Sequence, residues 1–276
     1  MARVTAADGT GLHYEDEGAG QPVLCLAGLT RNSADFGFLL PHLDGCRVIR
    51  MDYRGRGRSD PADPMSYTIL QEAEDAVLLL DHLGLPRVTV IGTSRGGLVA
   101  MVLAQFHRDR LAGVVLNDIG PEVAEAGLAR IMDYVGREPE LPDLETAAGA
   151  LAHVNAAGFP EVPLARWRDQ AAAMFVEKPG GGLGLRYDAR LREALIGQAG
   201  AGEAPDLWQM FDALRDIPTA AIRGENSDLL SPETFREMQA RHPGLIAATV
   251  PDRAHVPFLD EPEALAAIET LLERSA

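Results

Sequence analysis

The chain has 276 residues, of which 46% are hydrophobic and 24% charged, a composition typical of a globular protein built as one large or two small domains. Its formal net charge of -16 argues against nucleic acid and against an anionic membrane surface as partners, because long-range repulsion opposes both. We therefore expect a small-molecule partner, and the composition leaves the oligomeric state open.

The N-terminal sequence argues against secretion by way of a signal peptide. The first ten residues, MARVTAADGT, contain no apolar core of signal-peptide length, and apolar runs elsewhere are too short to span a bilayer. We therefore predict a cytoplasmic protein. Cys25 and Cys46 lie in predicted buried strands, and in a cytosolic chain we expect them to be reduced core thiols.

Strand and helix patterns alternate over the first part of the chain. Residues 3–15 surround an Asp-Gly turn and predict a hairpin, whereas the apolar runs at 22–29 and 46–55 predict strands buried on both faces. The segments that follow are predicted as a helix at 66–84, a strand at 87–92, a helix at 98–110 and a strand at 111–118. This alternation predicts an α/β fold, with a mostly parallel sheet covered by helices on both faces.

The pattern changes after residue 118. Residues 119–205 are rich in alanine, contain several prolines and a PGGGLG break, and show helical rather than strand periodicity. Alternation then resumes with a strand at 217–224, a helix at 231–244, a strand at 245–250 and a helix at 261–275. We therefore predict a core formed by residues 1–118 and 206–276, with 119–205 inserted as a helical cap.

A glycine-rich hexapeptide, GTSRGG at residues 92–97, lies between a predicted strand and a predicted helix. A bare G-x-S-x-G is a weak motif, but this context is the one that a nucleophile elbow requires. Gly92 and Gly96 lack the Cβ atoms that would keep strand and helix apart, and the helix N-terminus behind Ser94 favours an oxyanion. The glycine spacing fits neither a dinucleotide-binding loop nor a P-loop, which also needs a lysine. We therefore predict that Ser94 is a nucleophile.

A serine hydroxyl needs a base, and the base needs an acid that orients it. His255 follows the predicted strand 245–250 and therefore lies at the same sheet edge as Ser94. Asp228 follows the strand 217–224, and the order Ser94, Asp228, His255 is the order expected of a serine hydrolase on an α/β sheet. Asp118, at the end of the preceding strand, is the alternative acid. The sequence favours Asp228 and leaves Asp118 open.

These residues resemble the α/β-hydrolase fold superfamily, in particular serine hydrolases with a helical cap. The resemblance is carried by five segments spread along the chain: LCLAGLTRN, DYRGRGRSD, GTSRGG, RGENSDLLSPE and DRAHVPFLDEPEAL. It covers the cap least well.

The resemblance also implies an oxyanion hole. Its donors would be the backbone N–H groups of Leu29 and Arg95. Many relatives carry His-Gly where this chain has Ala27-Gly28, so an imidazole that would stiffen this loop is absent, although the backbone donor remains.

The side chain of Arg95 has two interpretations. It could enter the pocket and favour an anionic substrate, or it could form a buried ion pair with an acid such as Asp118, which we favour slightly. The basic run RGRGR at residues 54–58 is flanked by acids, and we interpret it as a structural turn rather than a nucleic-acid site.

The predicted activity is hydrolysis of a small-molecule ester or lactone through an acyl-enzyme on Ser94. The sequence contains no metal-binding motif with the required ligand spacing, so we expect neither a metal nor another cofactor. Alternatives that use the same triad are hydrolytic C–C cleavage of a dienone-type substrate and a cofactor-free perhydrolase. A non-enzymatic ligand receptor on this fold is a further alternative. A serine at the elbow argues against epoxide hydrolysis and dehalogenation, which use an aspartate nucleophile.

The predicted cap supplies several large side chains whose orientation the sequence leaves open. Their apolar character favours packing between cap and core over pocket lining. They are Phe159, Trp167, Met174, Phe175 and Tyr187.

Overall fold

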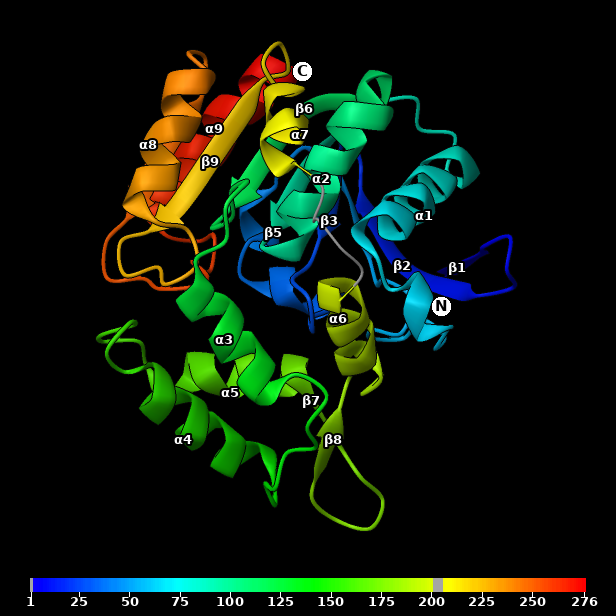
Figure 1. The fold of residues 1–276 in the computed structure, drawn as a ribbon, viewed down its shortest axis with the longest axis vertical. Helices are drawn as coiled ribbons and strands as arrows, with labels where there is room; N and C mark the ends of the chain where they lie inside the picture. The colour runs from blue at the N-terminus through cyan, green and yellow to red at the C-terminus, as the bar shows by residue number, and fades with distance from the viewer. Residues whose placement is uncertain (1, 201–205) are drawn as a thin grey trace.

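A computed structural model describes residues 2–200 and 206–276, and an eight-stranded sheet lies at its centre (Figure 1). The strand order is β1-β2-β4-β3-β5-β6-β9-β10. The pairs β1–β2 and β2–β4 are antiparallel, and all later pairs in this order are parallel. The strands are β1 (Ala2–Thr5), β2 (Gly11–Gly18), β3 (Gln21–Leu26), β4 (Cys46–Met51), β5 (Val88–Thr93), β6 (Leu111–Asn117), β9 (Thr219–Gly224) and β10 (Ile246–Val250). The predicted α/β class and the mostly parallel sheet are confirmed.

Helices connect the strands, as the alternating pattern predicts. They are α1 (Ile69–His82), α2 (Arg95–Phe106), α3 (Glu125–Tyr134), α4 (Leu144–Asn155), α5 (Leu164–Met174), α6 (Leu191–Gly200), α7 (Leu207–Asp212), α8 (Pro232–Arg241) and α9 (Pro262–Ser275). Local chemistry sets several of their ends. The side chain of Thr68 accepts a hydrogen bond from the Gln71 N–H and caps α1, and Gly84 follows that helix with φ +65°. Within residues 2–200 and 206–276, no helix is long and apolar enough to cross a membrane.

The sheet has a hydrophobic core on each face, because alternate residues of each buried strand point to opposite sides. Leu24 and Leu26 of β3 pack on one side with residues of α1, α2, α7 and α8. Val23 and Cys25 of the same strand pack on the other side with residues of α9 and with Phe36. Both faces are therefore covered, which explains why β5 is buried along its whole length and β3 over its last four residues, instead of alternating between buried and exposed positions.

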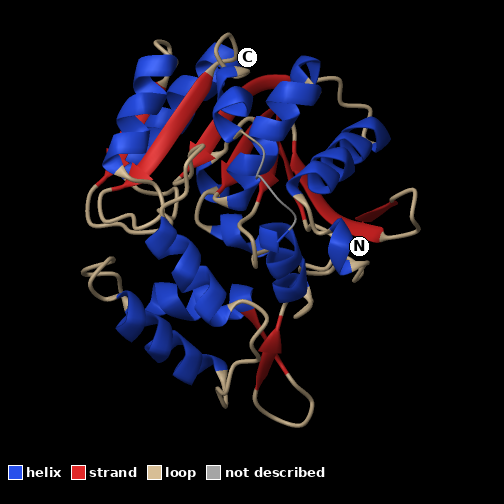
Figure 2. Cartoon of the chain, viewed as in Figure 1, coloured by secondary structure: helices blue, strands red, loops and turns tan. Residues whose placement is uncertain are grey.

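The segment between β6 and β9 contains α3 to α7 and the strands β7 and β8. The part from α3 to α6 lies at one end of the sheet, below it in the view of Figure 1, and Figure 2 shows its helices and its strand pair. Helix α7 instead lies beside α2 in the core. The division of the insertion from the core as residues 119–205 remains a prediction, and the predicted end at residue 205 lies outside the described residues.

The expectation that this insertion shows only helical structure is wrong at one point. Phe175–Glu177 (β7) and Leu183–Leu185 (β8) form a two-stranded antiparallel hairpin. The break that contains PGGGLG is the turn of this hairpin. Gly181 and Gly182 have φ values of +88° and +75°, a backbone conformation that glycine adopts without strain and that allows the chain to reverse.

Both cysteines are buried, free thiols, as predicted. Burial raises the pKa of Cys25 to about 12 and also raises the pKa of Cys46, because a thiolate is poorly solvated in an apolar core. A raised pKa favours the neutral thiol, so at about pH 8 roughly one Cys25 side chain in ten thousand is the reactive thiolate.

We expect Ellman's reagent to titrate less than about a tenth of a thiol per native chain within minutes, and both thiols after unfolding in guanidinium. Rapid titration of a full thiol in the native protein would contradict this expectation.

Candidate active site

Ser94 occupies a strained turn between β5 and α2. Its backbone has φ +51° and ψ -115°, a region that non-glycine residues rarely adopt. Close packing around the turn maintains this conformation. A Cβ atom on Gly96 would lie 2.0 Å from the carbonyl oxygen of Leu26, and one on Gly92 would lie 2.5 Å from the backbone of Gly96. The hexapeptide therefore has the geometry of a nucleophile elbow, as the sequence indicates.

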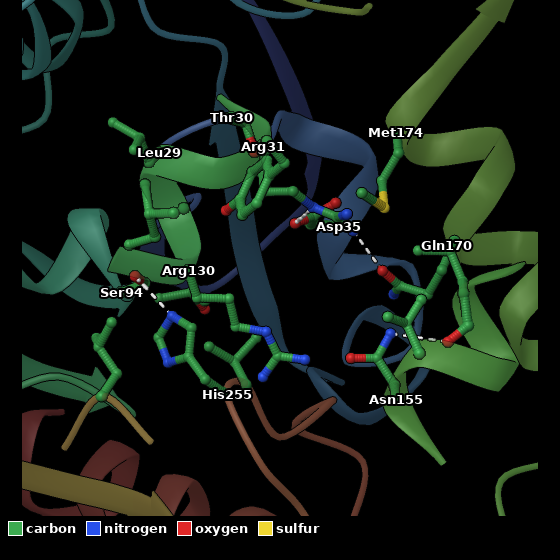
Figure 3. Close-up of a pocket in the computed structure, with 18 of the residues that line it drawn as sticks. Leu29, Thr30, Arg31, Asp35, Ser94, Arg130, Asn155, Gln170, Met174 and His255 are labelled. Atoms are coloured by element: carbon green, nitrogen blue, oxygen red, sulfur yellow. Dashed lines mark hydrogen bonds and ion pairs between the residues drawn. The ribbon is translucent and has the colours of Figure 1, made fainter. Parts of the chain in front are cut away.

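His255 contacts the Ser94 hydroxyl (Figure 3). The distance from Ser94 Oγ to His255 Nε2 is 2.9 Å, within hydrogen-bond range. His255 lies in the loop after β10, and this loop is held in part by Asn117, whose Nδ2 donates to the Pro257 carbonyl at 3.1 Å. The two residues with the strongest sequence signal are therefore brought together at one sheet edge.

The acid next to His255 is Asp118, and the preference for Asp228 is wrong. Asp118 Oδ2 lies 2.8 Å from His255 Nδ1. The Asp118 side chain is completely buried and also accepts hydrogen bonds from the Gly224 N–H at 2.8 Å and from the Ser227 hydroxyl at 2.6 Å. Asp228 instead forms an ion pair with Arg130 on α3, with Oδ2 2.9 Å from Nη1, and its side chain is partly exposed.

Sheet order explains this correction. β6 is the immediate neighbour of β5, so the residue after β6 ends beside the elbow that follows β5. Asp118 has φ +55°, which turns the chain at the end of the strand. β9 lies one strand farther from β5, and its following loop supports Asp118 through Ser227 rather than supplying the acid itself.

The three contacts define the proton positions. A carboxylate only accepts hydrogen bonds, so His255 Nδ1 carries the proton that is donated to Asp118. Nε2 is then the acceptor for the Ser94 hydroxyl. This is the tautomer in which an imidazole removes a proton from serine when the serine attacks a carbonyl group.

The two predicted oxyanion donors flank Ser94. Arg95 is the first residue of α2, and Leu29 lies in the loop after β3 and lines the same cavity as Ser94. A Cβ atom on Gly28 would lie 3.8 Å from Ser94 Cβ, so the backbone of this loop passes directly beside the nucleophile. The assignment of the Leu29 and Arg95 N–H groups as oxyanion donors remains a prediction that is compatible with these positions.

The Arg95 side chain does not enter the cavity. It is 6% exposed and pairs with Glu72 of α1, with Nε 2.6 Å from Oε2. Of the two interpretations from the sequence, the buried ion pair is the one found, but the partner is Glu72 rather than Asp118. Any preference for anionic substrates therefore has to come from other residues.

A cavity of about 590 Å³ opens above Ser94 and His255 and is lined by residues of both the core and the insertion. All five large side chains whose orientation the sequence left open line it, although Phe159 and Trp167 also pack in a hydrophobic cluster with Ala254. The sequence favoured packing between cap and core over lining of the pocket. This expectation is wrong as a choice between the two, because the rings of Phe159 and Trp167 do both.

Apart from Asp228, the charged groups at the cavity were not identified from the sequence as site residues. Arg31 pairs with Asp35 at 2.5 Å and donates to Gln170 of α5, whereas Arg130 extends into the cavity near His255 (Figure 3). Arg31 lies in the segment LCLAGLTRN and Arg130 in the predicted insertion, so only the folded chain shows that both line the same cavity. Within residues 2–200 and 206–276, no cluster of three or more His, Cys, Asp or Glu side chains could hold a metal ion.

Comparison with known proteins agrees with this geometry. The family model described as alpha/beta hydrolase fold matches residues 21–262. A 3-hydroxybutyrate-oligomer hydrolase from Cupriavidus necator is 36% identical over 253 residues, which are 88% of this chain and 85% of the relative. The crystal structure of an alpha/beta hydrolase from Novosphingobium aromaticivorans is 41% identical, covers 99% of this chain and 97% of its own, and superposes with a TM-score of 0.92.

A malate-bound thermophilic esterase from Thermogutta terrifontis is 29% identical, covers 100% of this chain and 99% of its own, and superposes with a TM-score of 0.71. These relatives support hydrolase activity in general. The elbow, the sheet order and the matched sequence lead to one conclusion: the chain belongs to the α/β-hydrolase fold family.

Proposed function

We propose that this protein is a serine hydrolase that cleaves a small-molecule ester through an acyl-enzyme on Ser94. The observation that carries the proposal is the continuous hydrogen-bonded chain from Ser94 Oγ through His255 to the buried Asp118 carboxylate, with distances of 2.9 and 2.8 Å. The cavity above it is wide enough for a small organic molecule and is built mainly of apolar side chains.

The proposed reaction has two steps. In the first, Ser94 Oγ attacks the ester carbonyl while its proton moves to His255 Nε2, and the N–H groups of Leu29 and Arg95 bind the oxyanion. Collapse of this intermediate breaks the bond to the alcohol, which leaves with the proton from His255. In the second step, water loses a proton to His255, attacks the acyl group and releases the carboxylic acid, and Ser94 regains its proton.

Two of the relatives support the choice of an ester. One is named as a hydrolase of 3-hydroxybutyrate oligomers, and another as an esterase. Oligomers of a hydroxy acid are joined by ester bonds. Lactones have the same reacting group, so we include them in the substrate class.

Two measurements test the proposal. We expect a fluorophosphonate probe to add one adduct per chain, located on Ser94 by peptide mass spectrometry, and we expect turnover of p-nitrophenyl esters or simple lactones. Ser94→Ala should take no adduct, whereas Ser66→Ala, which removes a hydroxyl that is bonded to Arg54 and does not line the cavity, should label like the native protein. The panel should include esters with and without a carboxylate, because Arg31 and Arg130 line the cavity.

A native protein that hydrolyses no ester or lactone and takes no adduct would contradict the proposal and favour the ligand-receptor alternative. Adduct formation on Ser94 without ester turnover would instead favour C–C bond cleavage or perhydrolysis, because both use the same nucleophile.

A further inference from the structure

A buried cluster of three charged side chains lies behind the candidate oxyanion hole. It consists of Arg56, from the loop after β4, Glu72 of α1 and Arg95 of α2, which are 1%, 0% and 6% exposed. Glu72 is the shared partner. Its Oε2 lies 2.6 Å from Arg95 Nε, and its Oε1 lies 3.1 Å from Arg95 Nη2 and 2.9 Å from Arg56 Nη2.

Each arginine of this cluster connects Glu72 to one of the two predicted oxyanion donors. Arg95 is itself the residue after Ser94, so its side chain anchors the first turn of α2. Arg56 Nε donates to the backbone carbonyl of Leu29 at 3.1 Å. One carboxylate thus connects the backbone of Leu29, through Arg56, with the backbone of Arg95, although Leu29 lies in the loop after β3 and Arg95 begins α2.

The loop that carries Leu29 needs such a support. Ala27 and Gly28 precede Leu29, and neither has a side chain able to form a hydrogen bond. A displacement of about 1 Å at a reacting group can lower a rate a hundredfold, so an oxyanion donor must be held in place by its surroundings. The Arg56 contact to the Leu29 carbonyl provides this restraint from behind, on the side away from the cavity, since Arg56 does not line the cavity.

Burial of this cluster carries a desolvation free energy that packing alone would not offset. Two guanidinium groups and one carboxylate are removed from water, and burial lowers the pKa of Arg56 whereas the nearby Glu72 raises it. The Arg56 guanidinium also lies over the Tyr67 ring, 5.0 Å from its centre, and Arg95 Nη2 donates to the Tyr67 carbonyl at 2.9 Å. Arg95 is thus fixed by hydrogen bonds from Nε and Nη2. Arg56 is fixed by hydrogen bonds from Nε and Nη1 to backbone carbonyls, and its Nη2 meets Glu72 as an ion pair without a hydrogen bond.

We propose that Glu72 is a positioning residue for the oxyanion hole, because it holds Arg56 against the Leu29 carbonyl and Arg95 against the elbow. This inference rests on the proposed serine-hydrolase function. Glu72 contacts neither the substrate cavity nor the triad, so it acts only through the two arginines.

The test is Glu72→Gln, which keeps the shape of the side chain and removes its charge. A loosened oxyanion hole affects the transition state more than the bound substrate, so we expect kcat to fall about tenfold while KM stays nearly constant. The affinity for a boronic acid that forms a tetrahedral adduct should fall by the same factor. The affinity for a planar substrate-like inhibitor and the shape of the pH–rate profile should not change.

Asp75→Asn is the matched control. Asp75 lies one turn farther along α1, is 1% exposed, and forms a buried bidentate ion pair with Arg54 at 2.7 Å. It thus resembles Glu72 in its helix, in its burial and in the loop that supplies its partner, but Arg54 does not contact Leu29 or the elbow. We expect Asp75→Asn to lower thermal stability and to leave kcat and the boronic acid affinity unchanged.

Equal losses of kcat in Glu72→Gln and Asp75→Asn would overturn the proposal, as would an unchanged kcat in a folded Glu72→Gln. If Glu72→Gln does not fold, Arg95→Lys tests the proposal instead. Lysine keeps the positive charge next to Glu72 but loses the contact that Arg95 makes through both Nε and Nη2. A smaller, KM-neutral loss of kcat supports the proposal, and no loss overturns it. If the proposed serine-hydrolase function is itself wrong, the result is different, because the native protein then shows neither esterase activity nor labelling of Ser94.

Discussion

Asp118→Asn should lower kcat for ester hydrolysis by about ten thousandfold while the protein stays folded. An asparagine at this position can present its NH₂ group to His255 Nδ1, and the imidazole then adopts the tautomer in which Nε2 carries the proton. That tautomer cannot accept the proton of Ser94. The loss should appear in kcat rather than in KM, and labelling by a fluorophosphonate should slow by a similar factor.

Asp228→Asn is the control for this substitution, because Asp228 also follows a strand and also lines the cavity. It removes a partly exposed ion pair with Arg130, and such pairs contribute little. We expect less than about a tenfold change in kcat/KM. A larger loss of kcat in Asp228→Asn than in Asp118→Asn would show that the geometry around His255 does not identify the working acid. Circular dichroism and the unfolding temperature of both variants separate a chemical effect from a folding defect.

Gly96→Ala should disrupt the elbow through a single methyl group. The new Cβ would lie 2.0 Å from the Leu26 carbonyl oxygen, and this atom belongs to the backbone of a central strand that cannot move aside cheaply. We expect a loss of about 3 kcal/mol in the free energy of unfolding, measured by urea denaturation. The displaced helix N-terminus should also lower kcat by at least about a hundredfold in the fraction that folds.

Gly149→Ala provides the opposite case. Gly149 is an exposed residue within α4, and a Cβ atom there would meet nothing within 4 Å. Alanine favours a helix over glycine, so we expect this variant to gain about 0.5–1 kcal/mol and to keep native kinetic constants. A Gly96→Ala variant as stable and active as Gly149→Ala would contradict the steric account of the elbow.

Much of the fold and part of the site follow from local patterns. Strands buried on both faces appear as continuous apolar runs, and helices follow from their periodicity and capping residues. Ser94 is recognisable because glycines at fixed spacing surround it between a strand and a helix, and His255 because it follows a late strand. These are properties of neighbouring residues, so no knowledge of the folded chain is needed to see them.

The acid could not be chosen in this way. Asp118 and Asp228 both follow parallel strands, both precede His255 in the chain, and both lie at the same sheet edge. The choice depends on which strand lies beside β5, and the sheet places β6 there and β9 one position farther away. Strand order is a property of the whole sheet, and the local sequence pattern of a strand does not indicate which strands pair with it.

The same reason applies to the arginines. Arg95 follows the nucleophile, but Glu72, its partner, comes from another helix 23 residues earlier, and Arg130 enters the cavity from the insertion. The sequence by itself determined the fold class and the candidate nucleophile and base, because local patterns of residues are enough to indicate each of them. Only the tertiary structure decided which acid lies beside His255, the direction of each charged side chain and the walls of the cavity, because these depend on contacts between segments that are far apart in the sequence.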